Sequence, residues 1–236
     1  MAIIKIKNLE FQYSSNDDTL FNIPELTIEK GSKLLIEGPS GSGKTTFLNL
    51  IAGLLIAKKG SIKVLNTEID QLKSTEMDQF RANHYGIIFQ LFNLIPHLSV
   101  LENIALPCMF SKLKKNNVLK KTSTINAHIN ELCNELDISK RLINKPVKQL
   151  SIGEQQRVAI ARALIGEPEI IIADEASSAL DEKRKNQFMD LLFRTTEKYN
   201  ATLIFVSHDK TLRTSFNQHY KLNSKEAKME LNYAIT

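Results

Sequence analysis

Residues 38–45 read Gly38-Pro39-Ser40-Gly41-Ser42-Gly43-Lys44-Thr45 and satisfy the pattern G-x-x-x-x-G-K-[ST]. Glycines at these spacings let successive backbone N–H groups point toward one anion, because no Cβ atom interferes. An apolar strand is predicted just before the motif, and a helix is predicted from residue 45 to about residue 55, burying Phe47, Leu54 and their neighbours on one side. The motif therefore predicts a nucleotide triphosphate site, with Lys44 at the β- and γ-phosphates and the Thr45 hydroxyl on Mg²⁺.

Two carboxylates follow a second apolar run. Residues 170–173 read Ile-Ile-Ile-Ala, and Asp174 and Glu175 come next. At the end of a buried strand, Asp174 would hold the metal through water, and Glu175 would orient and deprotonate the attacking water. Taken alone the pair would suit a helix cap equally well, but together with the phosphate motif it predicts nucleotide hydrolysis.

Size and composition limit the classes of protein to which the chain can belong. The chain has 236 residues, 42% of them hydrophobic, which suits one α/β domain with a full core. Its two cysteines exclude a disulfide framework and favour a reducing compartment. The apolar runs are far shorter than the roughly 20 residues that span a bilayer, so we expect a soluble, intracellular protein. The net charge of +5 is modest and leaves nucleic acid or an anionic membrane open as partners.

Strand and helix patterns alternate along the chain. Short strands are predicted in the first 30 residues around a turn at 14–18, and further strands at 61–65, 86–89, 169–173 and 202–206. Helical stretches between the last three predict a mostly parallel sheet. Residues 91 to about 150 have weak strand signals, and apolar residues between 125 and 136 recur at helical spacing, which predicts a helical insertion. It contains a lysine cluster, most simply a solvated face, made of Lys112, Lys114, Lys115, Lys120 and Lys121.

A third motif precedes the carboxylate pair. Residues 150–157 read Leu-Ser-Ile-Gly-Glu-Gln-Gln-Arg and resemble the signature motif of ATP-binding-cassette ATPases. The serine and glycine, Ser151 and Gly153, open a helix predicted to run to about residue 165, so its N-terminus can bind an anion. In the family this anion is the γ-phosphate held by the opposite subunit, which implies a head-to-tail homodimer joined by ATP.

Other residues match the same family in order. Tyr13 resembles the aromatic that stacks on adenine, and Gln90 resembles the glutamine at the junction of core and helical subdomain. Residues 178–181 resemble the loop that crosses to the partner subunit, and His208 resembles the switch histidine at the γ-phosphate. Taken singly, Tyr13 would also fit a strand-edge aromatic and His208 an ordinary loop histidine.

The resemblance implies both a fold and a site. The fold class is α/β, a P-loop NTPase (RecA-like) core with a mostly parallel sheet, an N-terminal antiparallel β subdomain and an inserted α-helical subdomain. One domain spans residues 1–236, with the core at about 1–90 and 158–236 and the helical subdomain at about 91–157. The implied cofactors are ATP and Mg²⁺. The implied catalytic residues are Glu175, His208, Lys44 and Gln90; the nucleotide contacts are Tyr13, Gly38, Pro39, Ser40, Gly41, Ser42, Gly43, Lys44, Thr45, Thr46, Ser151, Gly153, Glu154 and Asp181; the metal ligands are Thr45, Gln90 and Asp174.

The chain departs from the family pattern in three places. Ile152 stands where a glycine is usual, Glu154 where a glutamine is usual, and Ala176-Ser177 where proline-threonine is common. A β-branched residue would be strained at a positive φ, so we expect an ordinary backbone at Ile152, with Gly153 making the close approach to phosphate.

Residues 85–96 and 101–107 narrow the subtype. They resemble the lipoprotein-releasing and macrolide-exporting group, which implies an integral-membrane permease partner with an extracytoplasmic domain and a peripheral location on the cytoplasmic, inner face of the cell membrane. The cargo would be a lipid, lipoprotein, peptide or drug. An importer ATPase remains an alternative, as does a cassette acting on nucleic acid or ribosomes, although no nucleic-acid partner is expected because no long coiled-coil insertion, zinc site or tandem cassette is present. A kinase or GTPase is disfavoured by the signature motif.

One apolar cluster lies just after Gln90. Phe92, Leu94 and Ile95 precede Pro96, which stops a helix from burying all three on one side. We expect this cluster to dock the membrane subunit, with burial in the core as the alternative.

Overall fold

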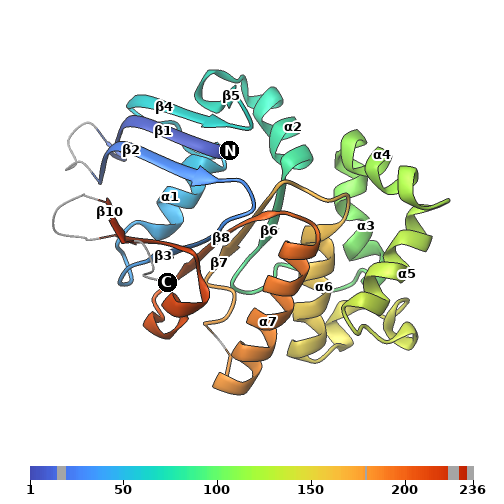
Figure 1. The fold of residues 1–236 in the computed structure, drawn as a ribbon. Coiled ribbons are helices and arrows are strands. Elements are labelled where there is room, and N and C mark those ends of the chain that lie inside the picture. Colours follow the sequence, from blue (N-terminus) through green and yellow to red (C-terminus); the bar gives the residue numbers. More distant parts are fainter. Residues whose placement is uncertain (15–19, 179, 223–228, 233–236) are drawn as a thin grey trace. The chain divides into compact units, whose positions relative to one another are not determined.

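The computed structural model describes residues 1–14, 20–178, 180–222 and 229–232 (Figure 1). The predicted turn at 14–18 falls almost entirely outside them. Contacts divide the chain into two compact units, one formed by Met1–Arg81 with Thr202–Thr236 and the other by Ala82–Ala201. These limits differ from the predicted core and helical subdomain, whose boundaries stay a prediction.

The first unit contains an antiparallel sheet with the strand order β2-β1-β4-β5. Its strands are β1 (Ala2–Phe11), β2 (Phe21–Glu29), β4 (Lys59–Val64) and β5 (Thr67–Glu68). Along β1 the side chains of Ile4 and Ile6 are buried while those of Lys5 and Lys7 are exposed, the alternation of a sheet with one face in the core. The expected N-terminal antiparallel subdomain is confirmed.

The same unit holds a second set of strands in the order β10-β9-β3-β8. They are β3 (Lys33–Glu37), β8 (Thr202–Ser207), β9 (Gln218–Leu222) and β10 (Met229–Asn232). Strand β3 runs parallel to both β8 and β9. Every residue of β8 is buried, as expected of a parallel strand covered on both faces.

The helix after the phosphate motif, α1 (Lys44–Ile51), is shorter than predicted. It ends because Ala52 caps it and Gly53 follows with a φ of +64°, the left-handed conformation that commonly closes a helix. The predicted continuation to residue 55 was therefore wrong, and Leu54 is exposed instead of buried. The 3₁₀ turn η1 (Ile69–Gln71) and the helix α2 (Ser74–His84) follow.

The second unit combines a parallel strand pair with helices. Strand β6 (Tyr85–Ile88) pairs with β7 (Ile170–Asp174). The limits of both strands lie within one residue of the predicted ones. The helices are α3 (Val100–Phe110), α4 (Lys112–Lys121), α5 (Ile125–Glu135), α6 (Ile152–Leu164) and α7 (Glu182–Lys198), with short 3₁₀ turns η2 (Lys140–Leu142) and η3 (Val147–Gln149). Helix α3 contacts α4, α5 and α6, so the expected helical insertion is present.

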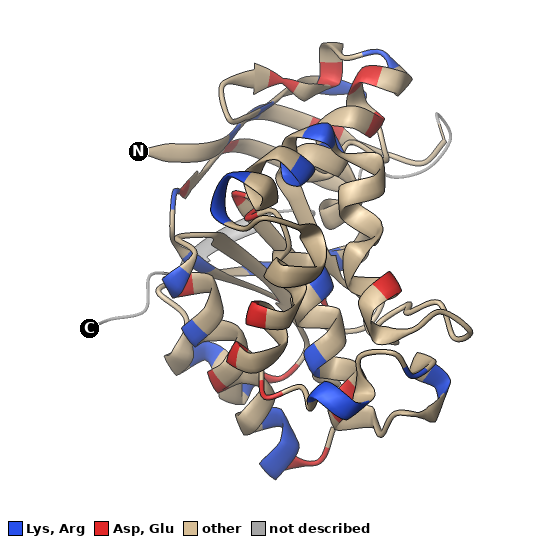
Figure 2. Cartoon of the chain, turned by 90° about the vertical axis from the view of Figure 1, so that its right-hand side faces the viewer, with Lys and Arg blue, Asp and Glu red and all other residues tan. Residues whose placement is uncertain are grey.

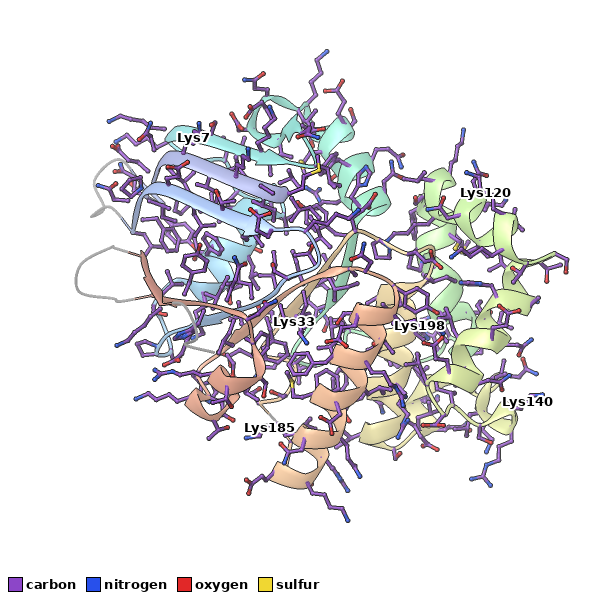
Figure 3. The ribbon with its side chains drawn as sticks, in the orientation of Figure 1. Lys7, Lys33, Lys120, Lys140, Lys185 and Lys198 are labelled. Atoms are coloured by element: carbon purple, nitrogen blue, oxygen red, sulfur yellow. The ribbon has the colours of Figure 1, made fainter. Side chains whose placement is uncertain are left out.

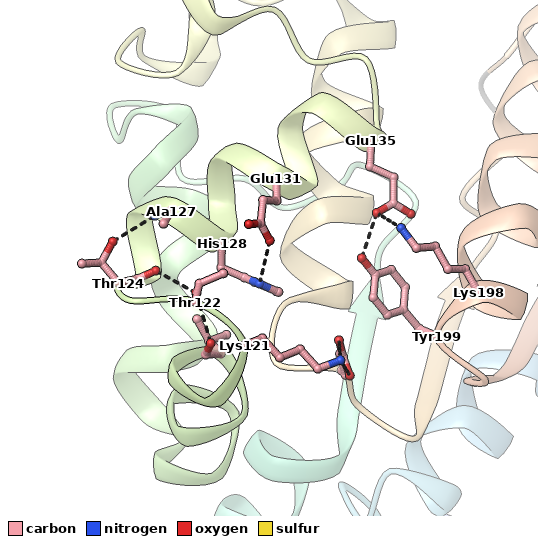
Figure 4. Close-up of polar contacts among 11 residues, drawn as sticks. Lys121, Thr122, Thr124, Ala127, His128, Glu131, Glu135, Lys198 and Tyr199 are labelled. Atoms are coloured by element: carbon pink, nitrogen blue, oxygen red, sulfur yellow. Dashed lines mark hydrogen bonds and ion pairs between the residues drawn. The ribbon is translucent and has the colours of Figure 1, made fainter.

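One carboxylate ties the end of α7 to α5. Glu135 accepts hydrogen bonds from the Lys198 ammonium at 2.6 Å and the Tyr199 hydroxyl at 2.9 Å (Figure 4). Burial and the nearby carboxylates raise the pKa of Tyr199, which keeps the phenol protonated as a donor. Among the described helices, none combines the length and apolar character that crossing a membrane requires.

Candidate active site

The phosphate motif forms a loop between β3 and α1. Gly41 and Gly43 adopt φ values of +78° and +92°, which L-residues with side chains rarely reach. The Lys44 ammonium lies inside the loop and donates to the carbonyl oxygens of Gly38 and Pro39, both at 2.9 Å. Lys44 is almost fully buried, so the loop holds a positive charge where the motif predicts phosphate.

The loop is also closely packed. A Cβ atom on Gly38 would lie 2.4 Å from Ser42 Oγ, and one on Gly43 would lie 2.8 Å from Phe21 Cζ. The buried Ser42 hydroxyl has no hydrogen-bond partner among the described residues. A buried hydroxyl of this kind is costly unless something accepts from it, and a phosphate oxygen would do so. The loop therefore fits the triphosphate of ATP.

The predicted adenine contact lies near the same helix. The Tyr13 hydroxyl and Thr46 Oγ1 are 2.5 Å apart, and the Tyr13 ring stacks edge-on against Phe11 with centroids 5.1 Å apart. The Tyr13 side chain is 65% exposed, which leaves ring surface for a base. Thr45 is exposed at the start of α1. Both roles remain predictions.

His208, the predicted switch histidine, follows a strand that pairs with the strand before the phosphate loop. In the parallel register Glu37 pairs with Ser207, so the next residues, Gly38 and His208, leave adjacent strands at the same edge of the sheet. Neighbouring strands are about 4.8 Å apart, which puts the two loops in contact range. His208 is exposed there, as its predicted role requires.

An ion pair between the buried Glu37 carboxylate and the partly exposed Arg213 guanidinium joins these two loops. Arg213, in the 3₁₀ turn η4 (Lys210–Ser215) just after His208, donates from Nε and Nη2 to the two Glu37 carboxylate oxygens at 2.5 and 2.7 Å. His219 on β9 contacts the same carboxylate at 3.0 Å. Hydrogen bonds and charge from Arg213 lower the pKa of Glu37 despite its burial. No short sequence motif predicts this group; the one signal is that the acidic Glu37 ends an apolar strand.

The carboxylates of the second unit follow a pair of parallel strands, β6 and β7. Ile88 pairs with Ala173, so Gln90 and the Asp174–Glu175 pair leave parallel neighbours at the same end. The Gln90 amide donates to Ser178 Oγ at 3.1 Å. Glu175 has a φ of +46°, an uncommon conformation for a residue with a side chain and one often found at functional turns. The structure thus brings Gln90, Asp174 and Glu175 together.

The loop after the carboxylates leads into α7. Asp181 caps that helix by accepting from the Arg184 backbone N–H at 3.0 Å, and it also pairs with the Arg184 guanidinium at 3.2 Å. Residue 179, part of the predicted crossing loop, lies outside the described residues. The nucleotide contact predicted for Asp181 stays a prediction.

The signature motif forms the start of α6. Ser151 caps the helix in a reciprocal box: its hydroxyl oxygen accepts from the Glu154 backbone N–H at 3.4 Å, and Glu154 Oε2 accepts from the Ser151 backbone N–H at 2.8 Å. The Ser151 hydroxyl also donates to Glu154 Oε2 at 2.8 Å. These bonds lower the pKa of Glu154. Ile152 is the first helical residue, which confirms the expected ordinary backbone. No described atom lies within 4 Å of a Cβ built on Gly153, so this turn is open.

A cavity of about 220 Å³ adjoins this turn between α6 and α7. Its lining includes Ser151, Gly153, Gln156, Arg157, Arg184 and Phe188. Arg157 already pairs with Asp137, and Arg184 with Asp181. Both arginine charges are therefore compensated, and the cavity is not by itself an anion site.

The expected docking cluster is only partly exposed. Phe92 is 7% exposed and sits in a turn with a φ of +59°. Arg162 on α6 fixes this turn by donating to the carbonyl oxygens of Phe92 at 2.5 Å and Asn93 at 2.7 Å. Leu94 and Ile95 are half-buried. For Phe92 the docking expectation was wrong, and burial in the core explains the residue.

Oxygen donors suited to Mg²⁺ are present in both units. Thr45 carries a hydroxyl in the first unit, and Gln90 and Asp174 carry oxygens in the second. In the described part of the chain no three His, Cys, Asp or Glu side chains form a ready-made metal cluster. In nucleotide sites Mg²⁺ is bound by one or two side chains together with phosphate oxygens, so a site of this kind needs only a few protein ligands.

A buried strand, a glycine loop enclosing a lysine and a helix N-terminus together define a phosphate-loop nucleotide triphosphatase. Comparison with known proteins narrows the class. Residues 21–178 match the family model for the ABC transporter. The chain is 35% identical to the lipoprotein-releasing system ATP-binding protein LolD of Alcanivorax borkumensis, over 94% of each chain. It is 37% identical to the bacitracin export ATP-binding protein BceA of Halalkalibacterium halodurans, over 89% of this chain and 80% of that protein.

A solved structure is similar over the whole fold. It is the dimeric post-hydrolysis state of the ATP-binding cassette MJ0796 of Methanocaldococcus jannaschii, bound to ADP and Pi. The TM-score is 0.80 with 32% identity, covering 98% of this chain and 100% of that one. The chain belongs to the ABC transporter family as an ATP-binding subunit, and its activity is ATP hydrolysis.

Proposed function

We propose that the chain powers export or extraction of a lipid, lipoprotein, peptide or drug, together with an integral-membrane permease that has an extracytoplasmic domain. The observation that carries this proposal is near full-length similarity to a lipoprotein-releasing and a bacitracin-exporting ATP-binding protein. The chain would act as a homodimer on the inner, cytoplasmic face of the cell membrane. Nothing in this role requires nucleic acid.

The phosphate loop binds the triphosphate of ATP in this proposal. Its backbone N–H groups and the Ser42 hydroxyl donate to phosphate oxygens, and Lys44 neutralises the β- and γ-phosphates. The positions of Lys44 and of the two positive-φ glycines support this role, because they direct the lysine and the backbone N–H groups toward one place. Tyr13 stacks on the base.

The carboxylate edge supplies the hydrolytic groups. Glu175 accepts a proton from the attacking water, and Gln90 orients that water from the neighbouring strand. Thr45, Gln90 and Asp174 would hold Mg²⁺, which would neutralise charge on the phosphates. His208 donates to the γ-phosphate from the edge where the phosphate loop begins.

The signature turn binds the ATP of the opposite subunit. Ser151, Gly153 and the N-terminus of α6 contact the γ-phosphate, and Glu154 and Asp181 line the same contact. ATP then lies between two copies and holds them together. Hydrolysis removes that link and opens the dimer, which moves the permease.

Two variants test this assignment because one should lose ATP hydrolysis and the other ATP binding. Glu175→Gln keeps the side-chain shape but loses the base, so turnover falls about hundredfold or more while ATP binding remains. Size-exclusion chromatography with Mg-ATP then shows a stable dimer. Lys44→Ala removes the charge opposite the phosphates, so it weakens ATP binding itself. A Glu175→Gln protein that stays monomeric under saturating Mg-ATP contradicts the dimer mechanism.

The transport role has a separate test. A tagged chain purified from native membranes in mild detergent should carry a membrane protein with a large extracytoplasmic domain. Co-purification with a solute-binding protein and its permease would instead indicate an importer and overturn the proposed direction.

A further inference from the structure

The corner between α3 and α4 is both apolar and basic at its surface. Met109 is 75% exposed and Phe110 70%, and Leu113 is exposed on the next helix. Lys112, Lys115 and Lys120 are exposed beside them. We call these six residues the α3–α4 corner. Large apolar side chains exposed in succession at a helix end are unusual on a surface that faces only water.

A buried serine holds the corner in shape. Ser111 is fully buried, donates from its hydroxyl to Asn83 Oδ1 at 2.7 Å and accepts from the Lys114 backbone N–H at 3.0 Å. Because this residue points inward between the two helices, Phe110 before it and Lys112 after it point outward.

The inner and outer sides of α4 differ sharply. Lys114 and Val118 are buried on the inner side, where the Lys114 ammonium donates to the Tyr85 carbonyl oxygen at 2.7 Å. The outer side carries Leu113 and Lys120, seven residues apart and so on one helix stripe. Figure 3 shows Lys120 extending away from the ribbon of α4. The outer side is therefore an accessible mixture of leucine and lysine.

The charge of this surface is one-sided. Residues 103–130 contain five lysines and no aspartate or glutamate, and Figure 2 marks the basic and acidic residues on the ribbon. The charge of Lys121 is neutralised by Glu167, because Lys121 Nζ lies 2.6 Å from Glu167 Oε1 (Lys121 is labelled in Figure 4). In the described part of the chain no ion pair involves the three lysines of the corner. Their charge is available to an anionic partner.

We propose that the α3–α4 corner contacts an anionic membrane surface, with its lysines on phospholipid headgroups and Met109, Phe110 and Leu113 in the interfacial layer. Basic residues interleaved with large apolar ones are the pattern of segments that lie in a bilayer interface. Each exposed lysine near an anionic membrane strengthens binding about fivefold. The inference rests on the proposed function only in placing the chain beside a membrane.

Vesicle co-sedimentation of the isolated full chain tests this contact. We expect binding to vesicles of phosphatidylglycerol and phosphatidylcholine in equal parts, weak binding to phosphatidylcholine alone, and loss of the difference at high salt. Replacing the three corner lysines by glutamate should weaken binding at least about tenfold. Met109→Ser with Phe110→Ser should weaken it by a similar factor even at high salt.

A matched control separates the corner from total charge. Lys5→Glu with Lys7→Glu and Lys140→Glu changes the net charge by the same amount on exposed residues elsewhere in the chain, and it should bind vesicles at least about tenfold more tightly than the corner variant. Melting temperature and ATP hydrolysis are measured on every variant, and both should match the wild type for the corner variants. If the lysine variant does not fold, the Met109–Phe110 variant decides the question.

Three results overturn the proposal. They are a wild-type chain that ignores anionic vesicles, a control variant that loses as much binding as the corner variant, and a corner variant that binds vesicles normally. A wild type that ignores vesicles while the corner variant no longer co-purifies with the permease would assign this surface to a protein partner. Because ATP hydrolysis is followed in the same samples, failure of the ATPase assignment is distinguishable from failure of the membrane contact.

Discussion

The phosphate loop and the signature turn both present a helix N-terminus, at α1 and α6, yet they use glycine differently. In the phosphate loop, Gly43 has a φ of +92° and no room for a Cβ atom beside Phe21. In the signature turn, Gly153 is part of the helix and faces open space. The phosphate loop depends on a left-handed backbone that glycine adopts without strain, whereas the signature turn depends on a side-chain cap.

The difference separates two reasons for having a glycine. At Gly43 the chain's own packing requires it, so a substitution damages the loop with or without ATP. At Gly153 only an approaching ligand can require it, so a substitution leaves the free subunit intact. This is also why Ile152 can occupy a position where the family usually has glycine: its backbone is ordinary and its side chain is half exposed.

Gly43→Ala has the largest expected effect. It combines a left-handed backbone with a clash against Phe21, so we expect the free energy of unfolding to fall by about 2 kcal/mol. ATP affinity should fall at least about tenfold, because the loop must shift to accommodate the methyl group. Denaturant unfolding and nucleotide titration measure both. Gly41→Ala is the matched control, since it has a φ of +78° without a clash and should cost about half as much.

Gly153→Ala should separate stability from activity. Alanine favours a helix over glycine, so the free energy of unfolding should rise by up to about 1 kcal/mol. ATP-dependent dimerisation and hydrolysis should fall about tenfold, because the methyl group blocks the approach of the opposite phosphate. A variant that loses both stability and activity would show that packing requires this glycine too, and the contrast with Gly43 would fail.

Ile152→Gly tests whether the departure from the family pattern impairs the site. Because the backbone at this position is already helical, we expect ATP hydrolysis to change by less than about tenfold, equivalent to about 1.4 kcal/mol of barrier. Steady-state ATPase assays decide this. A much larger gain would mean that the natural side chain obstructs the nucleotide.

The capping box should add a small pH dependence. Ser151 lowers the pKa of Glu154, so the box stabilises the folded chain above the ordinary carboxyl pKa, and this stabilisation is lost as pH falls through the folded-state pKa. We expect wild type to lose slightly more stability than Glu154→Gln between neutral pH and about pH 3, by about 0.3 kcal/mol, because solvent screens this exposed carboxylate. Parallel unfolding curves at several pH values measure the difference, and identical pH dependence would remove the electrostatic part of the cap.

The features that could be predicted correctly from the sequence are those that depend on short stretches of chain. The phosphate loop, the strand before Asp174 and the helix after Ser151 follow from short patterns, and each is where it was expected. The end of α1 was missed although Gly53 marked it, because the apolar spacing continued to Leu54. The burial of Phe92 depends on a turn held by Arg162, far along the chain, which no short window contains.

The same limit applies to Glu37 and Arg213. Their pairing depends on a turn after β8 returning to the end of β3, so only the folded sheet reveals it. The site roles that depend on short motifs could be proposed from sequence, whereas the contacts that hold those motifs in place could not.

The Glu37–Arg213 pair connects the loop that begins at Gly38 to the turn that follows His208. Two hydrogen bonds join the Arg213 guanidinium to the Glu37 carboxylate. Breaking them would leave the buried carboxylate without its cation, which is costly. The pair therefore ties the end of β3 to the turn that follows His208. In the proposed site, a phosphate that leaves this edge breaks its contact with His208, while Glu37 and Arg213 keep the two loops joined.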